Sequence, residues 1–305
     1  MSVLNLSQED LIRALPCWKG IKTIAPLHGG LSNESHLVSD RDERFVVRFG
    51  KDYPFHHVER AREIMTARAA YEAGFAPMVH YSAPGVMVSA FIDGKTLTGA
   101  DVRNDMPRIA ALIRDFHDGM AAHVSGAGFM FWVFHVIRDY ARTLSAHKGA
   151  WAGKLEGHVA LANELEAVQV PMPIVFGHND LLPANFIDDG KRLWLIDFEY
   201  AGFSTAMFDI AGVAANADMS GSEAEDFLTT YFAKGASGMA VQHFTATDLL
   251  RSFSAMQCAA TLREAMWAMV SQVHLNTPGV DFNAYANENL ARLDRALENY
   301  RRTFP

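Results

Sequence analysis

The chain carries, from His178 to Tyr200, the stretch HNDLLPANFIDDGKRLWLIDFEY. Three of its side chains, Asp180, Asn185 and Asp197, are able to bind a proton or a metal ion, and each adjoins an apolar segment. Leu193 to Ile196 reads as a short buried strand that ends on Asp197. Phosphoryl transfer to a hydroxyl group needs a carboxylate to accept the hydroxyl proton and two oxygen ligands for magnesium. Residue types and order together favour this chemistry over a plain polar hairpin.

Two motifs in this stretch also resemble those of a known family. HNDLLPANF and LIDFEYAG look like the catalytic-loop and metal-binding motifs of choline/ethanolamine kinases, a branch of the aminoglycoside-phosphotransferase-like kinases. Protein kinases write these motifs H-R-D-x-x-x-x-N and D-F-G. Asn179 replaces the arginine and Glu199 the glycine, as fits a small-molecule kinase. The resemblance implies that Asp180 is catalytic, that Asn185 and Asp197 hold Mg²⁺, and that ATP is the co-substrate.

Bulk properties restrict the other function classes. A chain of 305 residues can form two lobes, and a net charge of −8 argues against nonspecific nucleic-acid binding. The two cysteines, Cys17 and Cys258, lie far apart, which suits a reducing compartment. No signal-like segment opens the chain, and no apolar run approaches the ~18 residues of a membrane helix. We expect a cytoplasmic protein with no membrane insertion. The sequence is compatible with a homodimer but does not determine the oligomeric state.

The order of predicted elements indicates an α+β, protein-kinase-like two-lobed fold. Before Gly94 the pattern predicts a small antiparallel sheet with one main helix, and after it mostly helices. We expect a nucleotide-binding N-lobe at 1–92 and a catalytic, substrate-binding C-lobe at 93–305. Strands are predicted at 21–24, 34–38, 45–49, 79–81, 86–91, 174–176, 186–188 and 193–196, and helices at 7–15, 58–73, 105–123, 133–147, 153–168, 206–218, 223–233, 246–274 and 283–302.

A glycine-containing turn between the first two strands is the candidate phosphate loop. Gly29 and Gly30 let the backbone approach an anion, and Ser32 and Asn33 can add hydrogen bonds. Glycine pairs also form plain hairpin turns, and this one is not G-x-G-x-x-G. GGLSNESHLV, however, resembles the corresponding segment of choline kinases, which implies nucleotide binding here.

Arg48 is the candidate phosphate-binding cation. It alternates with Phe45, Val47 and Phe49 on its strand, where the resemblance implies an arginine that contacts phosphates. A surface arginine on an edge strand is the alternative. Glu59 and Glu63 are both available partners. The family pattern has a glutamate fourteen residues before the proline of G-x-x-P, which selects Glu63, while a solvated helix face is the simpler account.

The residues that would bind the acceptor substrate are predicted mainly from the family resemblance. A quaternary ammonium group cannot donate N–H hydrogen bonds, so aromatic faces and a nearby carboxylate hold it. Glu199, Tyr200, Trp267 and Tyr285 match the choline-pocket segments, although core packing explains the last two equally well. Choline kinases often carry two tryptophans three residues apart, whereas this chain has Trp267 and Val270. With fewer aromatic rings the site would select less strongly for trimethylammonium, so ethanolamine or another amino alcohol is also a candidate acceptor.

The resulting prediction is ATP-dependent phosphorylation of a small-molecule hydroxyl, that of choline or ethanolamine first. A kinase of the same superfamily acting on an aminoglycoside, thiamine or a sugar would share the nucleotide residues. A nucleotide-binding pseudokinase would lack a catalytic group, and none is missing from the motifs. His56, His57 and Glu59 could instead suggest a metallohydrolase, but they lack its ligand spacing.

Overall fold

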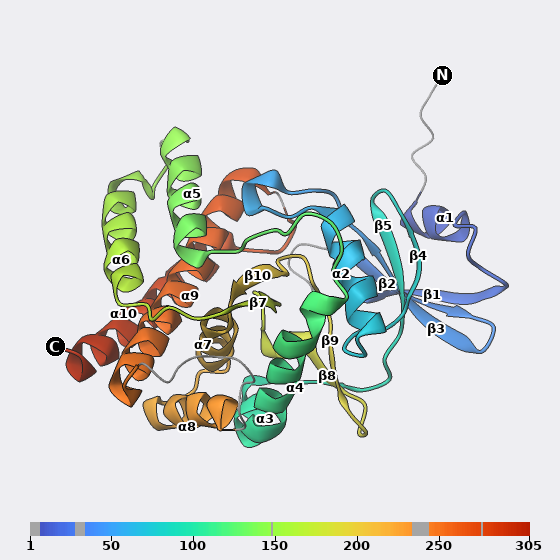
Figure 1. Cartoon of the computed structure of the whole chain (residues 1–305). Coiled ribbons are helices and arrows are strands. Elements are labelled where there is room, and N and C mark those ends of the chain that lie inside the picture. The colour runs from blue at the N-terminus through green and yellow to red at the C-terminus, as the bar shows by residue number, and fades with distance from the viewer. Residues whose placement is uncertain (1–6, 28–33, 148, 234–243, 276) are drawn as a thin grey trace.

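The computed structural model describes residues 7–27, 34–147, 149–233, 244–275 and 277–305. Its N-terminal part is a five-stranded antiparallel sheet in the order β1-β2-β3-β5-β4. One long helix stands between this sheet and the helical remainder of the chain (Figure 1). The elements of this part are α1 (Gln8–Arg13), β1 (Ile21–Leu27), β2 (Glu34–Asp40), β3 (Glu43–Phe49), α2 (Arg60–Glu72), β4 (Val79–Ala83) and β5 (Val86–Ala90).

The two faces of this sheet have different environments. Phe45 and Val47 of β3 enter a small core that also contains Ile12 of α1. Val46 and Arg48 alternate with them and line the cleft on the opposite face. Because side chains on a strand alternate between faces, burial of the first pair directs Arg48 into the cleft.

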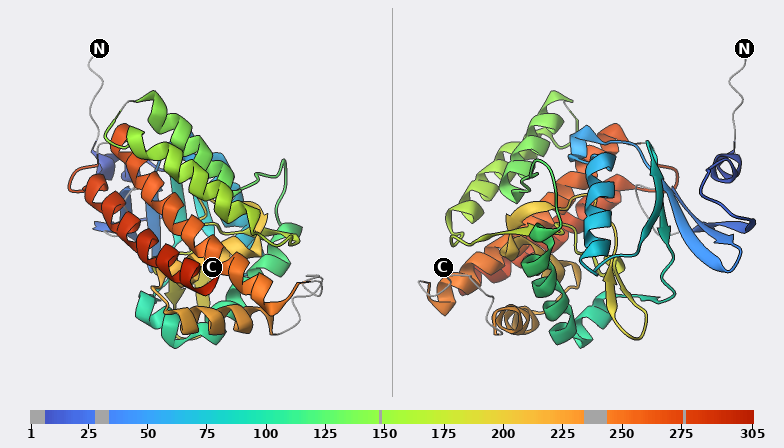
Figure 2. Two further views of the ribbon diagram at one scale, coloured as in Figure 1. Left: turned by 90° about the vertical axis from the view of Figure 1, so that its left-hand side faces the viewer. Right: turned by 45° about the vertical axis from the view of Figure 1, so that its right-hand side comes forward.

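The C-terminal part is mainly helical and is built around one helix of 29 residues, α9 (Ala246–His274). Helices α5, α7 and α10 pack along it (Figure 2). Both the small sheet and the helical part agree with the predicted protein-kinase-like fold. The remaining elements are β6 (Lys95–Thr96), α3 (Gly99–Asn104), α4 (Met106–Gly119), α5 (Val133–Ala146), α6 (Leu155–Ala167), β7 (Ile174–Gly177), β8 (Phe186–Asp188), β9 (Leu193–Leu195), β10 (Gly202–Thr205), α7 (Ala206–Asn216), α8 (Gly221–Phe232) and α10 (Phe282–Thr303).

Three short elements in this part were not expected from the sequence. Strands β6 and β10 contain two and four residues and exist because they pair with β8 and β7. Helix α3 had a local signal in the capping box of Thr98 and Asp101, which the hydrophobic pattern did not reveal. The expected helix 105–123 is α4 followed by a 3₁₀ turn at Met120–Ala122.

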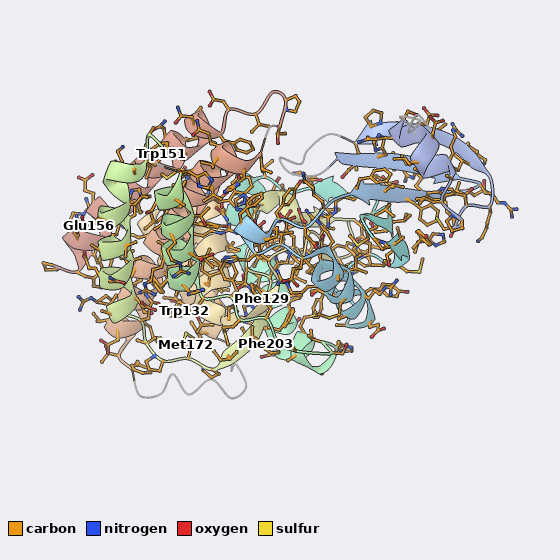
Figure 3. All side chains as sticks on the ribbon, turned by 90° about the horizontal axis from the view of Figure 1, so that it is seen from above. Phe129, Trp132, Trp151, Glu156, Met172 and Phe203 are labelled. Atoms are coloured by element: carbon orange, nitrogen blue, oxygen red, sulfur yellow. The ribbon has the colours of Figure 1, made fainter. Side chains whose placement is uncertain are left out.

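The pairing of β7 with β10 brings the two motif segments together. Gly177 at the end of β7 lies opposite Gly202 at the start of β10, so the loop containing Asp180 begins beside the point where the loop containing Asp197 ends. Phe129 joins this region, since its carbonyl accepts the N–H of Phe203 at 2.7 Å; the two side chains are labelled in Figure 3. No helix in the described part of the chain is long and apolar enough to cross a membrane.

Candidate active site

Asp209 of α7 holds the loop that carries Asp180 through hydrogen bonds to its backbone. The two carboxylate oxygens of Asp209 accept the backbone N–H groups of His178 and Asn179, each at 2.7 Å. Asn179 has a positive φ of 62°, and its side-chain amide donates to the carbonyls of Tyr200 at 3.1 Å and Gly202 at 3.2 Å. Asn179 therefore joins the two motif segments, and this leaves Asp180 at the tip of a fixed loop.

Asp209 itself is buried, with 1% of its surface exposed. Burial alone would raise the pKa of its carboxyl group, but the hydrogen bond from His117 and the nearby His178 hold it below its usual value. Gly177 must be a glycine here, because an added Cβ would lie 2.5 Å from Ser204 Oγ and 3.1 Å from Asp209 Oδ2. The loop is thus built on a closely packed polar support.

We expect Asp209→Ala to destabilise the protein substantially. Each of the two buried N–H groups left without an acceptor should lower the free energy of unfolding by about 1–3 kcal/mol. The depressed pKa means that the contribution of Asp209 is present above its unfolded-state value and is lost as pH falls through the folded-state value. Urea unfolding at neutral pH measures the loss. Asp226→Ala, on the exposed face of α8, is the control, and equal stability of the two variants would contradict this role.

Asn185 and Asp197 lie together as the candidate metal ligands. Asn185 ends the 3₁₀ turn Pro183–Asn185, and its side-chain nitrogen donates to the carbonyl of Asp180 at 2.8 Å, which leaves its amide oxygen available. The N–H of Ile196 donates to the carbonyl of Asn185, so the neighbouring Asp197 is placed beside it. One carboxylate and one amide oxygen are hard ligands that fit Mg²⁺. In the described ranges, no three His, Cys, Asp or Glu residues cluster as a metal site.

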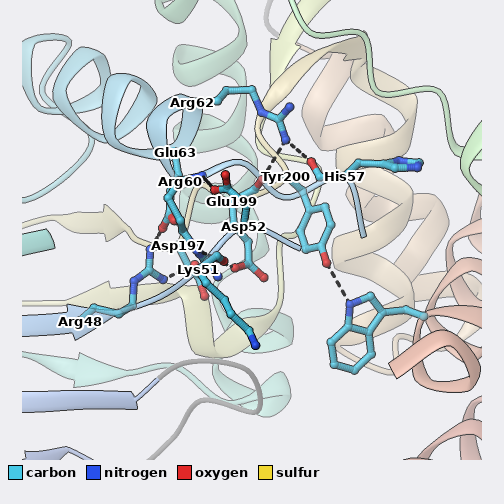
Figure 4. Close-up of polar contacts among 11 residues, drawn as sticks. Arg48, Lys51, Asp52, His57, Arg60, Arg62, Glu63, Asp197, Glu199 and Tyr200 are labelled. Carbon is cyan, nitrogen blue, oxygen red and sulfur yellow. Dashed lines mark hydrogen bonds and ion pairs between the residues drawn. The ribbon is translucent and has the colours of Figure 1, made fainter. Parts of the chain in front are cut away.

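Arg48 belongs to a chain of alternating charges that crosses from the sheet to the helical part (Figure 4). Its Nη1 lies 2.6 Å from Asp197 Oδ1, and it forms an ion pair with Glu63. Arg60 then joins Glu63, at 2.6 Å, to Glu199, at 2.9 Å. Burial alone would raise the pKa of Asp197, but Arg48 holds it below its usual value. Of the two glutamates considered from the sequence, Glu63 is the partner of Arg48.

A cleft of about 510 Å³ lies between the sheet and the helical part. Arg48 and Asp197 lie in its lining, as does Asn185. Apolar side chains from both sides, including Met87 and Ile196, complete the lining. This combination of apolar walls with a few converging polar groups is typical of a cofactor or nucleotide site.

Of the two aromatic residues predicted from the C-terminal helices, Trp267 contacts Tyr200 and Tyr285 contacts Trp267. Trp267 Nε1 donates to the Tyr200 hydroxyl at 2.9 Å, and Tyr285 packs edge-on against Trp267 at a centroid distance of 6.2 Å. The Tyr285 hydroxyl donates in turn to Glu264 Oε1 at 2.8 Å. Trp267 is only 7% exposed, so it serves core packing and this cluster together.

Comparison with known proteins shows which family the chain belongs to. The family profile described as choline/ethanolamine kinase matches residues 24–294. The chain belongs to the choline/ethanolamine kinase family. Ethanolamine kinase 2 of Mus musculus is 32% identical over 90% of this chain and 77% of its own, and Protein LicA of Haemophilus influenzae is 23% identical over 88% and 78%. A choline/ethanolamine kinase family protein from Mesorhizobium loti has a crystal structure that superposes with a TM-score of 0.73, at 25% identity over 97% and 98% of the chains.

Two charged residues of this family member, Arg263 and Glu264 on α9, were missed from the sequence. Arg263 Nη1 lies 3.4 Å from Asp180 Oδ1 and 2.9 Å from Glu264 Oε2, and its guanidinium carbon is 4.4 Å from the centre of the Tyr200 ring. Their signal was available, because they are the only acidic or basic residues between 252 and 273, in an otherwise uncharged and largely apolar helix. Charged residues on such a helix need partners inside the fold.

Glu199 and the glycine-containing turn differ from the other predicted binding residues. The resemblance implies that Glu199 faces an ammonium group, but Glu199 is buried and paired with Arg60, a partner that no sequence motif indicates. Burial raises its pKa, as does the neighbouring Asp197. Gly29, Gly30, Ser32 and Asn33 lie outside the described residues.

Proposed function

We propose that this kinase-family chain transfers the terminal phosphoryl group of ATP to the hydroxyl of a small amino alcohol, choline or ethanolamine, to form its phosphate ester. The position of Asp180 carries the proposal. On one side it adjoins the segment with Asn185 and Asp197, and on the other it contacts Arg263 of the cluster that includes Tyr200. A hydroxyl bound beside that cluster would therefore meet both a proton acceptor and the phosphate-binding cleft.

Each side chain in this arrangement has a distinct proposed task. Asp180 orients the acceptor hydroxyl and takes its proton. Arg48, positioned by Glu63, steadies the phosphates, and Gly29, Gly30, Ser32 and Asn33, outside the described residues, are the proposed further phosphate contacts. Asn185 and Asp197 would hold Mg²⁺, which neutralises charge on the transferred phosphoryl group. Residues 1–92 serve as the nucleotide-binding lobe and residues 93–305 as the catalytic lobe.

The aromatic and acidic residues around Tyr200 form the proposed amine site. Because Glu199 is paired with Arg60, Glu264 is the carboxylate in direct contact with this cluster. Tyr200, Trp267 and Tyr285 provide the apolar walls, and Glu199 supports the adjoining segment. A carboxylate beside aromatic rings fits a cationic acceptor better than a neutral sugar.

The direct test is ATP consumption by the purified protein against choline, ethanolamine, an aminoglycoside, thiamine and a simple sugar, with and without Mg²⁺. Magnesium-dependent turnover with an amino alcohol is the expected result. Turnover with an aminoglycoside or thiamine, and with neither amino alcohol, would reject the acceptor while keeping the kinase assignment. Nucleotide binding without turnover of any acceptor would favour a pseudokinase.

We expect Trp267→Phe to raise the KM for the amino alcohol several-fold while the KM for ATP stays nearly constant. The change removes the hydrogen bond to Tyr200 and shrinks an aromatic wall whose cation–π contact is worth about 0.5–2 kcal/mol. Trp267→Ala should raise this KM further, but emptying so buried a site also lowers stability by about 3–5 kcal/mol. Steady-state kinetics measures both constants. Trp194→Phe is the matched control, since it loses an equivalent N–H bond, to Asp189, outside the site. An unchanged amino-alcohol KM in Trp267→Phe would argue that Trp267 is purely structural.

A further inference from the structure

We propose that Arg263 makes the acceptor site selective for a small primary amino alcohol, of the ethanolamine class, and against a trimethylammonium group. This inference rests on the proposed function and assigns its substrate class. The relevant contacts are those of the Arg263 guanidinium with Tyr200, Asp180 and Glu264.

One face of the Tyr200 ring, a candidate surface for a quaternary ammonium group, is already covered by a cation. The Arg263 guanidinium carbon lies 4.4 Å from the Tyr200 ring centre and 5.8 Å from that of Phe131. Arg263 is 4% exposed, so ion pairs and packing hold it in place. A cation–π contact needs the open ring face within about 6 Å. A trimethylammonium group would have to displace a buried arginine to reach this face of Tyr200.

The charges around Arg263 leave room for one further cation that can donate hydrogen bonds. Asp180 and Glu264 both contact Nη1 of Arg263, so two carboxylates share a single internal positive charge. Because they meet at one nitrogen, a two-carbon amino alcohol can place its hydroxyl at Asp180 and its ammonium at Glu264. A primary ammonium has three N–H donors for the free carboxylate lone pairs. A trimethylammonium has none, and it would leave those lone pairs buried and unsatisfied.

The space beside Asp180 is also small. A cleft whose lining includes Asp180, Arg263 and Glu264, and no residue of the aromatic cluster around Tyr200, has a volume of about 20 Å³. A single water molecule needs roughly 10–15 Å³ by the same measure, so any acceptor that enters this cleft requires side chains to move, and each added methyl group requires a larger movement. Arg263 contributes two further donors, Nε and Nη2, which are buried and have no hydrogen-bond partner among the described residues. The lone pairs of an acceptor hydroxyl bound beside Arg263 would satisfy such a donor.

The unaltered protein allows a first test that no folding defect can obscure. The kcat/KM should be measured for ethanolamine, its N-methyl and N,N-dimethyl derivatives, and choline. We expect a stepwise decrease with methylation and a difference of at least about tenfold between the two ends of the series, because each methyl removes a donor. Equal or better turnover of choline would overturn the inference and leave the proposed function intact. Turnover of none of the four would overturn both.

The Arg263→Met variant then separates this residue from the rest of the site. It keeps much of the side-chain volume and removes the cation from the Tyr200 face, so the ratio of kcat/KM for ethanolamine to that for choline should fall to within about threefold of unity. Absolute turnover is expected to drop for both acceptors, because Asp180 loses a contact, but only a specificity role changes the ratio. Arg192→Met is the matched control, since Arg192 stacks on Trp194 at 4.0 Å in the β8–β9 hairpin. An unchanged ratio in a folded Arg263→Met would reject the assignment of selectivity to Arg263.

Discussion

Replacing Asp180 with asparagine should lower kcat by roughly 10²–10⁴-fold with little change in nucleotide affinity. The amide keeps the shape of the side chain but cannot accept the hydroxyl proton. The phosphate-side contacts of Arg48 and Asp197 do not involve Asp180. Single-turnover kinetics and calorimetric ATP titration measure the two quantities separately.

The protonation of Asp180 gives this prediction a second readout. Burial raises the pKa of Asp180 well above its usual value, and Glu264 adds to the effect while Arg263 opposes it. Since the base must be ionised, kcat should fall as pH drops through this raised value, at a higher pH than for an ordinary carboxylate. That acid limb should be absent from the residual activity of Asp180→Asn. Asp294→Asn, exposed on α10, is the control, and near-normal turnover of Asp180→Asn would remove Asp180 from the catalytic role.

Asp197→Ala is expected to abolish magnesium-dependent turnover and to remove the magnesium dependence of nucleotide binding. The variant lacks the only carboxylate in the proposed metal pair, since the other ligand, Asn185, is neutral. It also leaves Arg48 without one of its two carboxylate partners. The measurement is calorimetric ATP binding with and without Mg²⁺.

Two controls define the outcome for Asp197. Asp189→Ala removes a carboxylate from the turn between β8 and β9, outside the cleft lining, and should retain the magnesium effect. If Asp197→Ala binds magnesium-nucleotide as tightly as the unaltered chain, the metal ligands lie elsewhere. If binding is weakened equally with and without Mg²⁺, Asp197 acts mainly through Arg48.

The parts of the fold that the sequence predicted correctly are those governed by local patterns. The strand with Phe45, Val47 and Arg48 alternates with period two, and burial of its apolar face is enough to aim Arg48 at the cleft. The long helix α9 has the predicted bounds, and in the structure the capping box of Thr245 and Asp248 marks its start. Strands β6 and β10 were missed because a strand of two to four residues exists only through its partner.

The same distinction applies to the candidate site: residues close in sequence were predicted, and partners distant in sequence were not. The residues from Asp180 to Asp197 are close in the chain and were recognised as a motif. The long-range ion pairs were not recognised. Arg60 and Glu199 are 139 residues apart, and Arg263 and Asp180 are 83 residues apart. A sequence pattern cannot select a partner at that distance among many arginines, because the choice depends on how helices pack.

By itself the sequence determined a kinase-like catalytic loop, its candidate metal ligands and the order of a small sheet followed by helices. These follow from residue types at short, fixed spacings. Only the tertiary structure decided that Glu199 is neutralised by Arg60 and that Arg263 covers the face of Tyr200. A buried charge must find an opposite charge in the folded state, and desolvation makes that requirement strong. The identity of the partner is therefore set by the packing of α2 and α9 around the loop.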